Sequence, residues 1–361
     1  MKKTINKSFV LLLVLGFQTL VLGQSKTIYA GIEVGAKAIK VTVIDVPDLK
    51  NDVYSVVSVS TESALIGKGV STKGIVLEED IETAATLVLK NFVEIKAKYS
   101  LPEENIFVVI SSGVGVAKNV KTLAAAIEKS INKKPEIITQ ENEAKLFVKG
   151  GIPLKRHEDS MVYDIGGGNS KGGFVVKVAG EKGLMFIPLG IEYGTVTLTE
   201  KIKKETKNQN DFSEYLVLTS KNKDSVSNKI KLNFANNSLL QRKANIYFSG
   251  GTVWSFITLT KNQNGDAYKK FTLQDVKDYH LDLVTNFSKF EQLAAENPEA
   301  ETVLKTYSQK YLIAGNAILL SVLENLEYLN EKELYFVNNG HLTWLKAYVV
   351  EKISGKSSKI Y

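Results

Sequence analysis

A carboxylate followed by three glycines stands near the middle of the chain. The apolar run 161–165 contains Asp164, and Gly166, Gly167 and Gly168 follow it directly. Glycines let a backbone approach a phosphate closely, and successive N–H groups form a concave site for anions. A carboxylate beside them suits a metal-bound water or a bridging Mg²⁺. The segment predicts a β-hairpin that binds phosphate, with an ordinary glycine-rich hairpin as the alternative.

Two more glycine turns follow predicted strands. Gly35 comes after the run 27–33, and Gly250 and Gly251 come after 246–248. One glycine-rich turn is weak evidence for a phosphate site, because such turns also serve ordinary hairpins. Three of them in one chain are a more specific signal.

A mixed pattern of strands and helices must position these turns. We predict strands over residues 27–33, 39–45, 53–59, 106–110, 161–165, 174–178, 185–189, 246–248 and 334–337. Apolar residues at helical spacing predict helices over 79–99, 123–131, 193–203, 304–326 and 342–350, and another that contains Glu143. The strand, glycine turn, strand pattern starts again at residue 161, which indicates two related halves, each a mixed sheet with flanking helices.

The composition of the 361 residues is that of a globular protein, with 44% hydrophobic and 24% charged residues and a net charge of +7. Nearly all the basic residues are lysines, and Arg156 and Arg242 are the two arginines. Lysines of this kind usually lie on solvated faces, and no basic stripe is interleaved with aromatic residues. We therefore expect no nucleic-acid binding.

The N-terminus has the pattern of an export signal. Three lysines precede the apolar run 9–17, and Gly23 suits cleavage by a signal peptidase. We predict a signal peptide over residues 1–23, a periplasmic or secreted bacterial protein, and no stable membrane insertion after cleavage. An uncleaved anchor is the alternative. The chain has no cysteine, which excludes disulfides and a lipid-modified cysteine.

The three turns resemble the phosphate-1, phosphate-2 and adenosine turns of the actin-like ATPase and sugar kinase superfamily. Within it, the chain is similar to the exopolyphosphatase and guanosine pentaphosphate phosphohydrolase (Ppx/GppA) family from about residue 28 to about 350. The similarity rests on the Asp164 turn and on residues 138–146, 188–190, 197–200 and 311–326. It implies an α/β, two-lobed, ribonuclease H-like fold with a central cleft. The lobes would cover 24–148 and 149–361, with a lysine- and asparagine-rich region around 204–243.

The resemblance also implies roles for single residues. Glu143 falls where the family holds a glutamate that activates the attacking water. Asp164 and Glu33 would hold Mg²⁺ or Mn²⁺. The phosphate-binding residues implied are Gly35, Lys37, Gly166, Gly167, Gly168, Asn169, Ser170, Gly250 and Gly251. Taken alone, Glu143 would be a solvated helix residue and Lys37 a surface lysine.

The chain departs from the family pattern at several phosphate ligands. Glu33 replaces an aspartate, and residues 36–38 replace hydroxyl-bearing ones. Gly115 and Thr343 stand where arginines are expected, and residues 169–171 read Asn-Ser-Lys in place of Ser-Thr-Glu. Lost arginines are lost bidentate phosphate ligands, which distant lysines do not replace.

Two functions remain open. The first is a phosphoanhydride hydrolase that releases terminal phosphate from inorganic polyphosphate. The second is a catalytically degenerate member that binds polyphosphate, nucleotide or a protein partner without turnover. The sequence also leaves open that the chain forms a homodimer. The presence of Glu143 and Asp164 favours the first function, and the lost hydroxyls and arginines favour the second.

Overall fold

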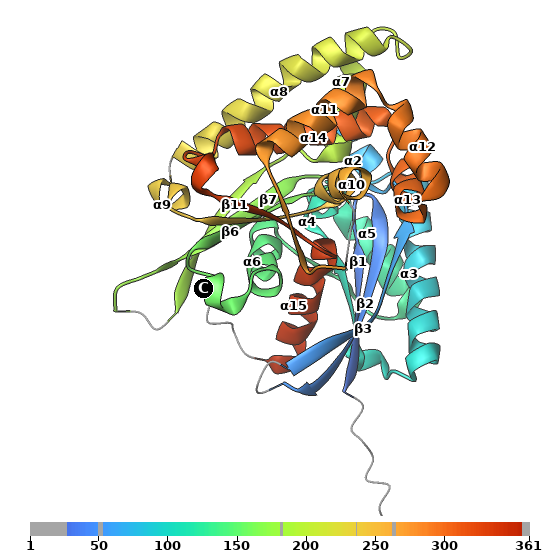
Figure 1. Ribbon diagram of the computed structural model, residues 1–361. Coiled ribbons are helices and arrows are strands. Elements are labelled where there is room, and N and C mark those ends of the chain that lie inside the picture. The colour runs from blue at the N-terminus through green and yellow to red at the C-terminus, as the bar shows by residue number, and fades with distance from the viewer. Residues whose placement is uncertain (1–26, 50–52, 181–182, 236, 262–264, 356–361) are drawn as a thin grey trace, which may run out of the picture.

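The chain forms two lobes, each built on a mixed β-sheet (Figure 1). The computed structural model describes residues 27–49, 53–180, 183–235, 237–261 and 265–355. The predicted signal peptide, residues 1–23, lies outside the described residues. No helix in the described part is long and apolar enough to cross a membrane.

The first lobe contains a five-stranded sheet with the order β3-β2-β1-β4-β5. Its strands are β1 (Ile28–Val34), β2 (Ala38–Asp48), β3 (Val53–Ser63), β4 (Ile106–Ile110) and β5 (Glu136–Ile137). Its helices are α2 (Gly67–Lys73), α3 (Glu78–Tyr99), α4 (Ser112–Gly115) and α5 (Val120–Ile131). The apolar residues of α3 recur every three or four positions, so one face of this helix, with Ile81, Val88 and Phe92, is buried against β1 and β2.

The second lobe contains a six-stranded sheet with the order β10-β11-β9-β6-β7-β8. Its strands are β6 (Ser160–Ile165), β7 (Ser170–Lys177), β8 (Leu184–Ile191), β9 (Asn245–Ser249), β10 (Tyr268–Phe271) and β11 (Glu333–Val337). β6 pairs antiparallel with β7 and parallel with β9, just as β1 pairs with β2 and β4. The repeated pattern expected from the sequence therefore corresponds to two equivalent hairpins. The edge strand β10 was not expected.

Eight helices follow the strands of the second lobe in the described residues. They are α7 (Thr195–Glu205), α8 (Phe212–Ala235), α9 (Ser238–Gln241), α10 (Gly251–Thr260), α11 (Leu273–Thr285), α12 (Ser288–Glu296), α13 (Pro298–Thr306) and α14 (Gln309–Glu324). α14 is buried on every side and contacts α7, α8, α10 and α11. A helix that is apolar all round belongs inside a core.

One expectation about helices in this lobe is corrected. The single helix expected over 304–326 is two helices, because Tyr307 and Ser308 are extended between α13 and α14. The lysine- and asparagine-rich region is mostly the long helix α8. Its inner face buries Tyr215, Ile230 and Phe234 in the core while its lysines face outward.

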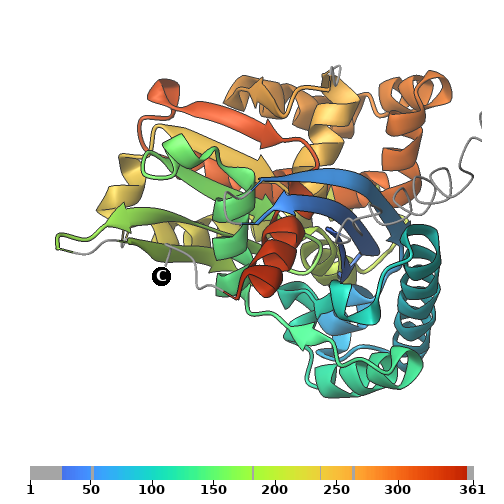
Figure 2. The same ribbon diagram turned by 90° about the horizontal axis from the view of Figure 1, so that it is seen from below.

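Two helices lie between the sheets: α6 (Gln140–Gly151) and α15 (Gly340–Ser354) (Figures 1 and 2). They pack on each other, and α15 also contacts β1, β2 and β9. Their apolar residues share one cluster with side chains of both sheets. A boundary between residues 148 and 149 would cut α6, and α15 brings the C-terminal residues back to the first sheet. The lobes therefore share an apolar core at this end.

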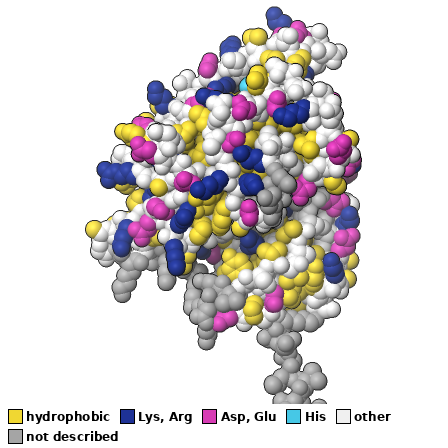
Figure 3. Space-filling view, in the orientation of Figure 1, with side chains coloured by type: hydrophobic (Ala, Val, Ile, Leu, Met, Phe, Trp, Pro, Cys, Tyr) yellow, Lys and Arg dark blue, Asp and Glu magenta, His cyan; other side chains and the backbone are white. Residues whose placement is uncertain are grey.

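The surface carries both signs of charge. In Figure 3, lysine and arginine side chains are scattered among aspartate and glutamate over the visible face. Many lysines of the described residues pair with carboxylates at the surface, such as Lys90 with Glu62 and Lys289 with Asp282. The lysines on this face are exposed to solvent, as the sequence predicts.

Candidate functional site

A cavity of about 350 Å³ lies between the two lobes. Gly35 reaches it from the β1–β2 turn, Gly167 from the β6–β7 turn, and Gly250 from the turn between β9 and α10. The Gly167 and Gly250 turns meet because β6 and β9 are parallel neighbours, and the carboxyl ends of parallel strands share one edge of a sheet. The Gly35 turn comes from the other sheet and faces them across the cavity. Glu143 and Asp164 line the same cavity, so the structure brings the predicted turns and carboxylates together.

The β6–β7 turn is held by its own backbone and by the next helix. The N–H of Gly166 donates to the carbonyl of Asn169 at 3.1 Å, and the N–H of Thr195 donates to the carbonyl of Gly166 at 2.8 Å. A Cβ at Gly168 would lie 2.6 Å from the carbonyl oxygen of Gly113 in the first lobe. Glycine is required there because the backbones of the two lobes are in contact.

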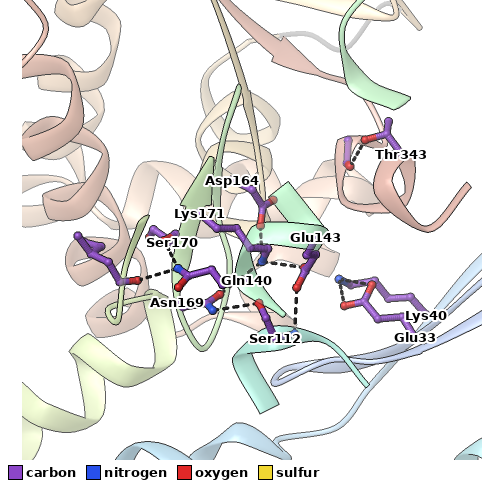
Figure 4. A network of polar contacts seen from close by, with 12 residues as sticks. Glu33, Lys40, Ser112, Gln140, Glu143, Asp164, Asn169, Ser170, Lys171 and Thr343 are labelled. Atoms are coloured by element: carbon purple, nitrogen blue, oxygen red, sulfur yellow. Dashed lines mark hydrogen bonds and ion pairs between the residues drawn. The ribbon is translucent and has the colours of Figure 1, made fainter. Parts of the chain in front are cut away.

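Lys171 lines the cavity and lies between Glu143 and Asp164 (Figure 4). Its Nζ lies 2.8 Å from Oε1 of Glu143 and 2.9 Å from Oδ2 of Asp164. The other carboxylate oxygen of Glu143 accepts a hydrogen bond of 2.9 Å from the backbone N–H of Ser112. All three charged side chains are buried, at 10% exposure or less. One cation thus binds both carboxylates that were expected to carry the chemistry.

The charges of this cluster stabilise one another. Burial alone would raise the pKa of Asp164, but the adjacent Lys171 ammonium outweighs it and holds that pKa below its usual range. Burial would lower the pKa of Lys171, and the carboxylates of Asp164 and Glu143 instead raise it. Asp164 is therefore ionised and Lys171 protonated at neutral pH.

A second ion pair lies at the cavity wall. Glu33 on β1 and Lys40 on β2 face each other in the sheet, and Nζ of Lys40 lies 3.0 and 3.1 Å from the two carboxylate oxygens. Glu33 is 2% exposed. Burial, only partly offset by Lys40, raises the pKa of Glu33 to about 7. Glu33 is thus engaged by its strand neighbour and is half-protonated near neutral pH.

Lys37 lines the cavity but is held by aromatic rings of the second lobe. Its Nζ lies 5.2 Å from the ring centre of Tyr307 and 4.8 Å from that of Tyr311. Burial, together with the nearby Lys203, lowers the pKa of Lys37 to about 8. Such cation–π contacts hold the ammonium near the rings, so a phosphate would have to share it.

The Gly250–Gly251 turn is covered by Tyr307. Gly250 has a φ of 95°, which favours glycine, and a Cβ at Gly251 would lie 1.9 Å from the Tyr307 hydroxyl. Tyr307 is buried at 6% exposure. The extended residues that break the expected helix therefore place an aromatic ring over the third glycine turn.

Asn169 and Ser170 have different positions. Asn169 lines the cavity and its amide donates to the Ser112 hydroxyl at 3.0 Å. Ser170 is fully buried, and its hydroxyl donates to the carbonyl of Tyr193 at 2.7 Å. Ser170, predicted to bind phosphate, thus holds the hairpin to a neighbouring segment. Adjacent side chains of β7 point to opposite faces, so Ser170 points away from the cavity that Lys171 lines.

The residues present do not fit the expected Mg²⁺ or Mn²⁺. Asp164 contacts Lys171, and both oxygens of Glu33 contact Lys40. The part of the chain that the structure describes contains no cluster of three histidine, cysteine, aspartate or glutamate side chains suited to a metal ion. Each carboxylate proposed for metal binding already has a lysine as its counter-ion.

The positions of the missing arginines carry no replacement cation. Gly115 belongs to the short helix α4, and a Cβ there would lie 3.1 Å from Ile137. Thr343 is buried, and its hydroxyl donates to the carbonyl of Gly340 at 2.7 Å. These positions are therefore packed structural sites.

Lys171, Lys40 and Tyr307 are the site residues that sequence reasoning missed. Lys171 was noted only as a departure from the family pattern. Asp164 and Lys171 are direct partners across the β6–β7 hairpin, as Glu33 and Lys40 are across β1–β2. Counting residues outward from each turn would have paired each carboxylate with its lysine. Tyr307 leaves no such local signal.

The fold and the position of the glycine turns identify the class of protein. Two sheets of matching topology, with glycine turns meeting in the cleft between them, form the actin-like ATPase fold. Residues 43–340 match the Ppx/GppA phosphatase family, and the chain belongs to that family.

Solved structures agree with this fold. An exopolyphosphatase from Cytophaga hutchinsonii is 16% identical, with a TM-score of 0.66 over 91% of this chain and 99% of its own. A Ppx/GppA family member from Aquifex aeolicus is 18% identical, with a TM-score of 0.61 over 92% of this chain and 99% of its own. At these identities the likeness shows the fold. No curated protein matches the sequence.

Proposed function

We propose that the cleft binds a chain of phosphoanhydride-linked phosphates, with inorganic polyphosphate as the ligand, and holds it without turnover. The observation that carries the proposal is the position of Lys171. Its ammonium binds both Glu143 and Asp164 in a cavity lined by the glycine turns.

Binding would come from backbone donors and shared lysines. Gly35 and Gly167 present their turns to the cavity, beside Lys37 and Lys40. These two lysines and Lys171 are balanced by three carboxylates of the same wall, so the cavity has little net charge when all are ionised. We therefore expect moderate affinity that falls with added salt.

Loss of turnover follows from the requirements of phosphoanhydride hydrolysis. The reaction needs a water aligned with the bond and cations on the transferred oxygens. Both oxygens of Glu143 are already engaged, by Lys171 and by the Ser112 N–H. Neither expected arginine is present. The groups that would activate water and neutralise charge are thus bound to one another.

Hydrolysis of terminal phosphate is the second candidate. The observation in its favour is that Glu143 still lines the cavity, beside the phosphate-2 turn. A carboxylate oxygen can accept more than one hydrogen bond, so Glu143 retains capacity for a water. This candidate would be supported if the wild type releases phosphate and Glu143→Gln does not.

A substitution in the turn tests the binding site. The space around Gly167 admits a Cβ, whose nearest neighbour would be Val196 at 3.4 Å. Gly167→Asp should weaken polyphosphate binding at least about tenfold, because it adds a negative charge where the anion lies. Gly167→Asn is the matched control, with similar size and no charge, and should bind nearly as the wild type does.

The measurements are calorimetric titration with inorganic polyphosphate of defined length and a phosphate-release assay with and without Mg²⁺ or Mn²⁺. Binding by the wild type without release supports the proposal. Binding with release supports the second candidate. No binding by the wild type, or equal binding by Gly167→Asp and Gly167→Asn, would show that the cleft is not the site.

A further inference from the structure

The strongest unexplained feature of the molecule is a lysine buried between carboxylates from separate elements. Glu143 comes from α6, Asp164 from the end of β6, and Lys171 from β7. Removing one member of such a buried group would leave an uncompensated charge, which is costly. The three groups therefore act as one unit within the cavity.

We propose that the Lys171 ammonium is a built-in cation, which stands between Glu143 and Asp164 where a divalent metal would otherwise bind, so that the protein takes no Mg²⁺ or Mn²⁺ at this site. This role of Lys171 is independent of any phosphate ligand.

The ammonium group is fully coordinated. A lysine has three N–H donors and no acceptor. Nζ of Lys171 faces Oε1 of Glu143 at 2.8 Å, Oδ2 of Asp164 at 2.9 Å and Oδ1 of Asn169 at 3.4 Å. Three donors thus meet three oxygens. These oxygens are also the hard ligands that Mg²⁺ or Mn²⁺ would require, so lysine and metal compete for the same atoms.

The hairpin anchors this cation in place. Lys171 is the direct partner of Asp164 across β6 and β7. A Cβ at the next residue, Gly172, would lie 2.2 Å from the Val162 carbonyl, so the two strands are tightly paired there. A metal ion would have to expel a tethered ammonium from a site where it is 7% exposed. The strand register therefore favours the lysine.

No third carboxylate is available to strengthen a metal site. Glu33, the remaining carboxylate of the cavity wall, is bound through both oxygens by Lys40. The described residues contain no group of three suitable ligands. Replacing Lys171 by glutamate would create such a group with Glu143 and Asp164.

The direct test is a titration of the wild-type protein with Mn²⁺, in which electron paramagnetic resonance measures the free Mn²⁺ at each step. We expect no stoichiometric binding at this site. Lys171→Glu should bind one Mn²⁺ at least about tenfold more tightly than the wild type does, because three carboxylates would then face one point. Adding Asp164→Asn to that variant should remove the binding.

Lys177→Glu is the matched control, because it makes the same charge change on the exposed end of β7. It should bind Mn²⁺ no better than the wild type. Lys171→Met, of similar length and without charge, tests the same point if Lys171→Glu does not fold.

One stoichiometric Mn²⁺ in the wild type, lost in Asp164→Asn, would overturn the inference. Lys171 variants that fold and bind no more Mn²⁺ than the wild type would also contradict it. Since the titration contains no phosphate, either result leaves the proposed polyphosphate binding to be judged by its own experiment.

Discussion

The three lysines that line the cavity each have an internal partner. Lys171 binds two carboxylates, Lys40 binds Glu33, and Lys37 lies against two tyrosine rings. An incoming anion must share these cations with groups of the protein. Lysine is a point charge without the bidentate fork of arginine, so the resulting contacts are weaker and more sensitive to salt.

Glu33 should make the stability of the protein depend on pH. Its pKa is about 7 in the folded state, above the ordinary value, because it is buried. The folded state therefore binds a proton that the unfolded state releases, and the stability contributed by this group falls as pH rises from about 4.5 to 7. Glu33→Gln should be as stable as the wild type at low pH and more stable, by at most about 3 kcal/mol, above pH 8.

Urea denaturation of both proteins at several pH values checks this expectation. Gln keeps the size of Glu33, and the side chain of Lys40 is 21% exposed and retains access to water. A difference in unfolding free energy that does not change with pH would contradict the assigned pKa.

At the scale of elements, the helices around α14 decide how the second lobe holds its turns. α14 packs against α7, which starts directly behind the Gly166–Gly168 turn, and against α10, which starts at Gly251. The extended residues before α14 place Tyr307 over the Gly251 turn. The positions of two glycine turns thus depend on one buried helix.

Shortening a buried side chain of α14 should therefore strongly destabilise the protein. Leu319 is fully buried, and Leu319→Ala should lower the free energy of unfolding by about 2–5 kcal/mol, because it leaves a cavity in the core. Leu232 on α8 is 68% exposed, and Leu232→Ala is the matched control, with an expected change of less than about 0.5 kcal/mol. Equal losses in urea denaturation would show that α14 is not the central helix.

At the scale of the whole molecule, the two lobes share a core at one end and leave a cavity at the other. The apolar cluster around α6 and α15 joins both sheets. Mixed surface charges (Figure 3) fit the expectation that the protein does not bind nucleic acid. That expectation and the homodimer stay predictions.

Export is a prediction at this scale. Residues 1–23 should be absent from the mature protein, because basic residues followed by a short apolar run direct export and cleavage. N-terminal sequencing of protein recovered from the cell envelope or medium should begin at Gln24. A first residue of Met1 in that material would support the uncleaved anchor instead.

The local sequence predicted most of the fold. Strand β4 over 106–110 and helix α3 over 78–99 follow from apolar periodicity, which depends on neighbours in the chain. The three glycine turns follow for the same reason. The resemblance to a family implied that these turns meet in one cleft, and in the structure all three line one cavity.

Contacts between distant segments decided the rest. Tyr307, where the predicted helix breaks, packs over Gly251, and Ser170 donates to the carbonyl of Tyr193. Above all, the resemblance to a family implied that Glu143 activates water, whereas the packing of α6 against the β6–β7 hairpin brings its carboxylate to Lys171. The sequence shows which residues are charged. The interaction between two charges depends on the distance between them, and only the tertiary structure sets that distance.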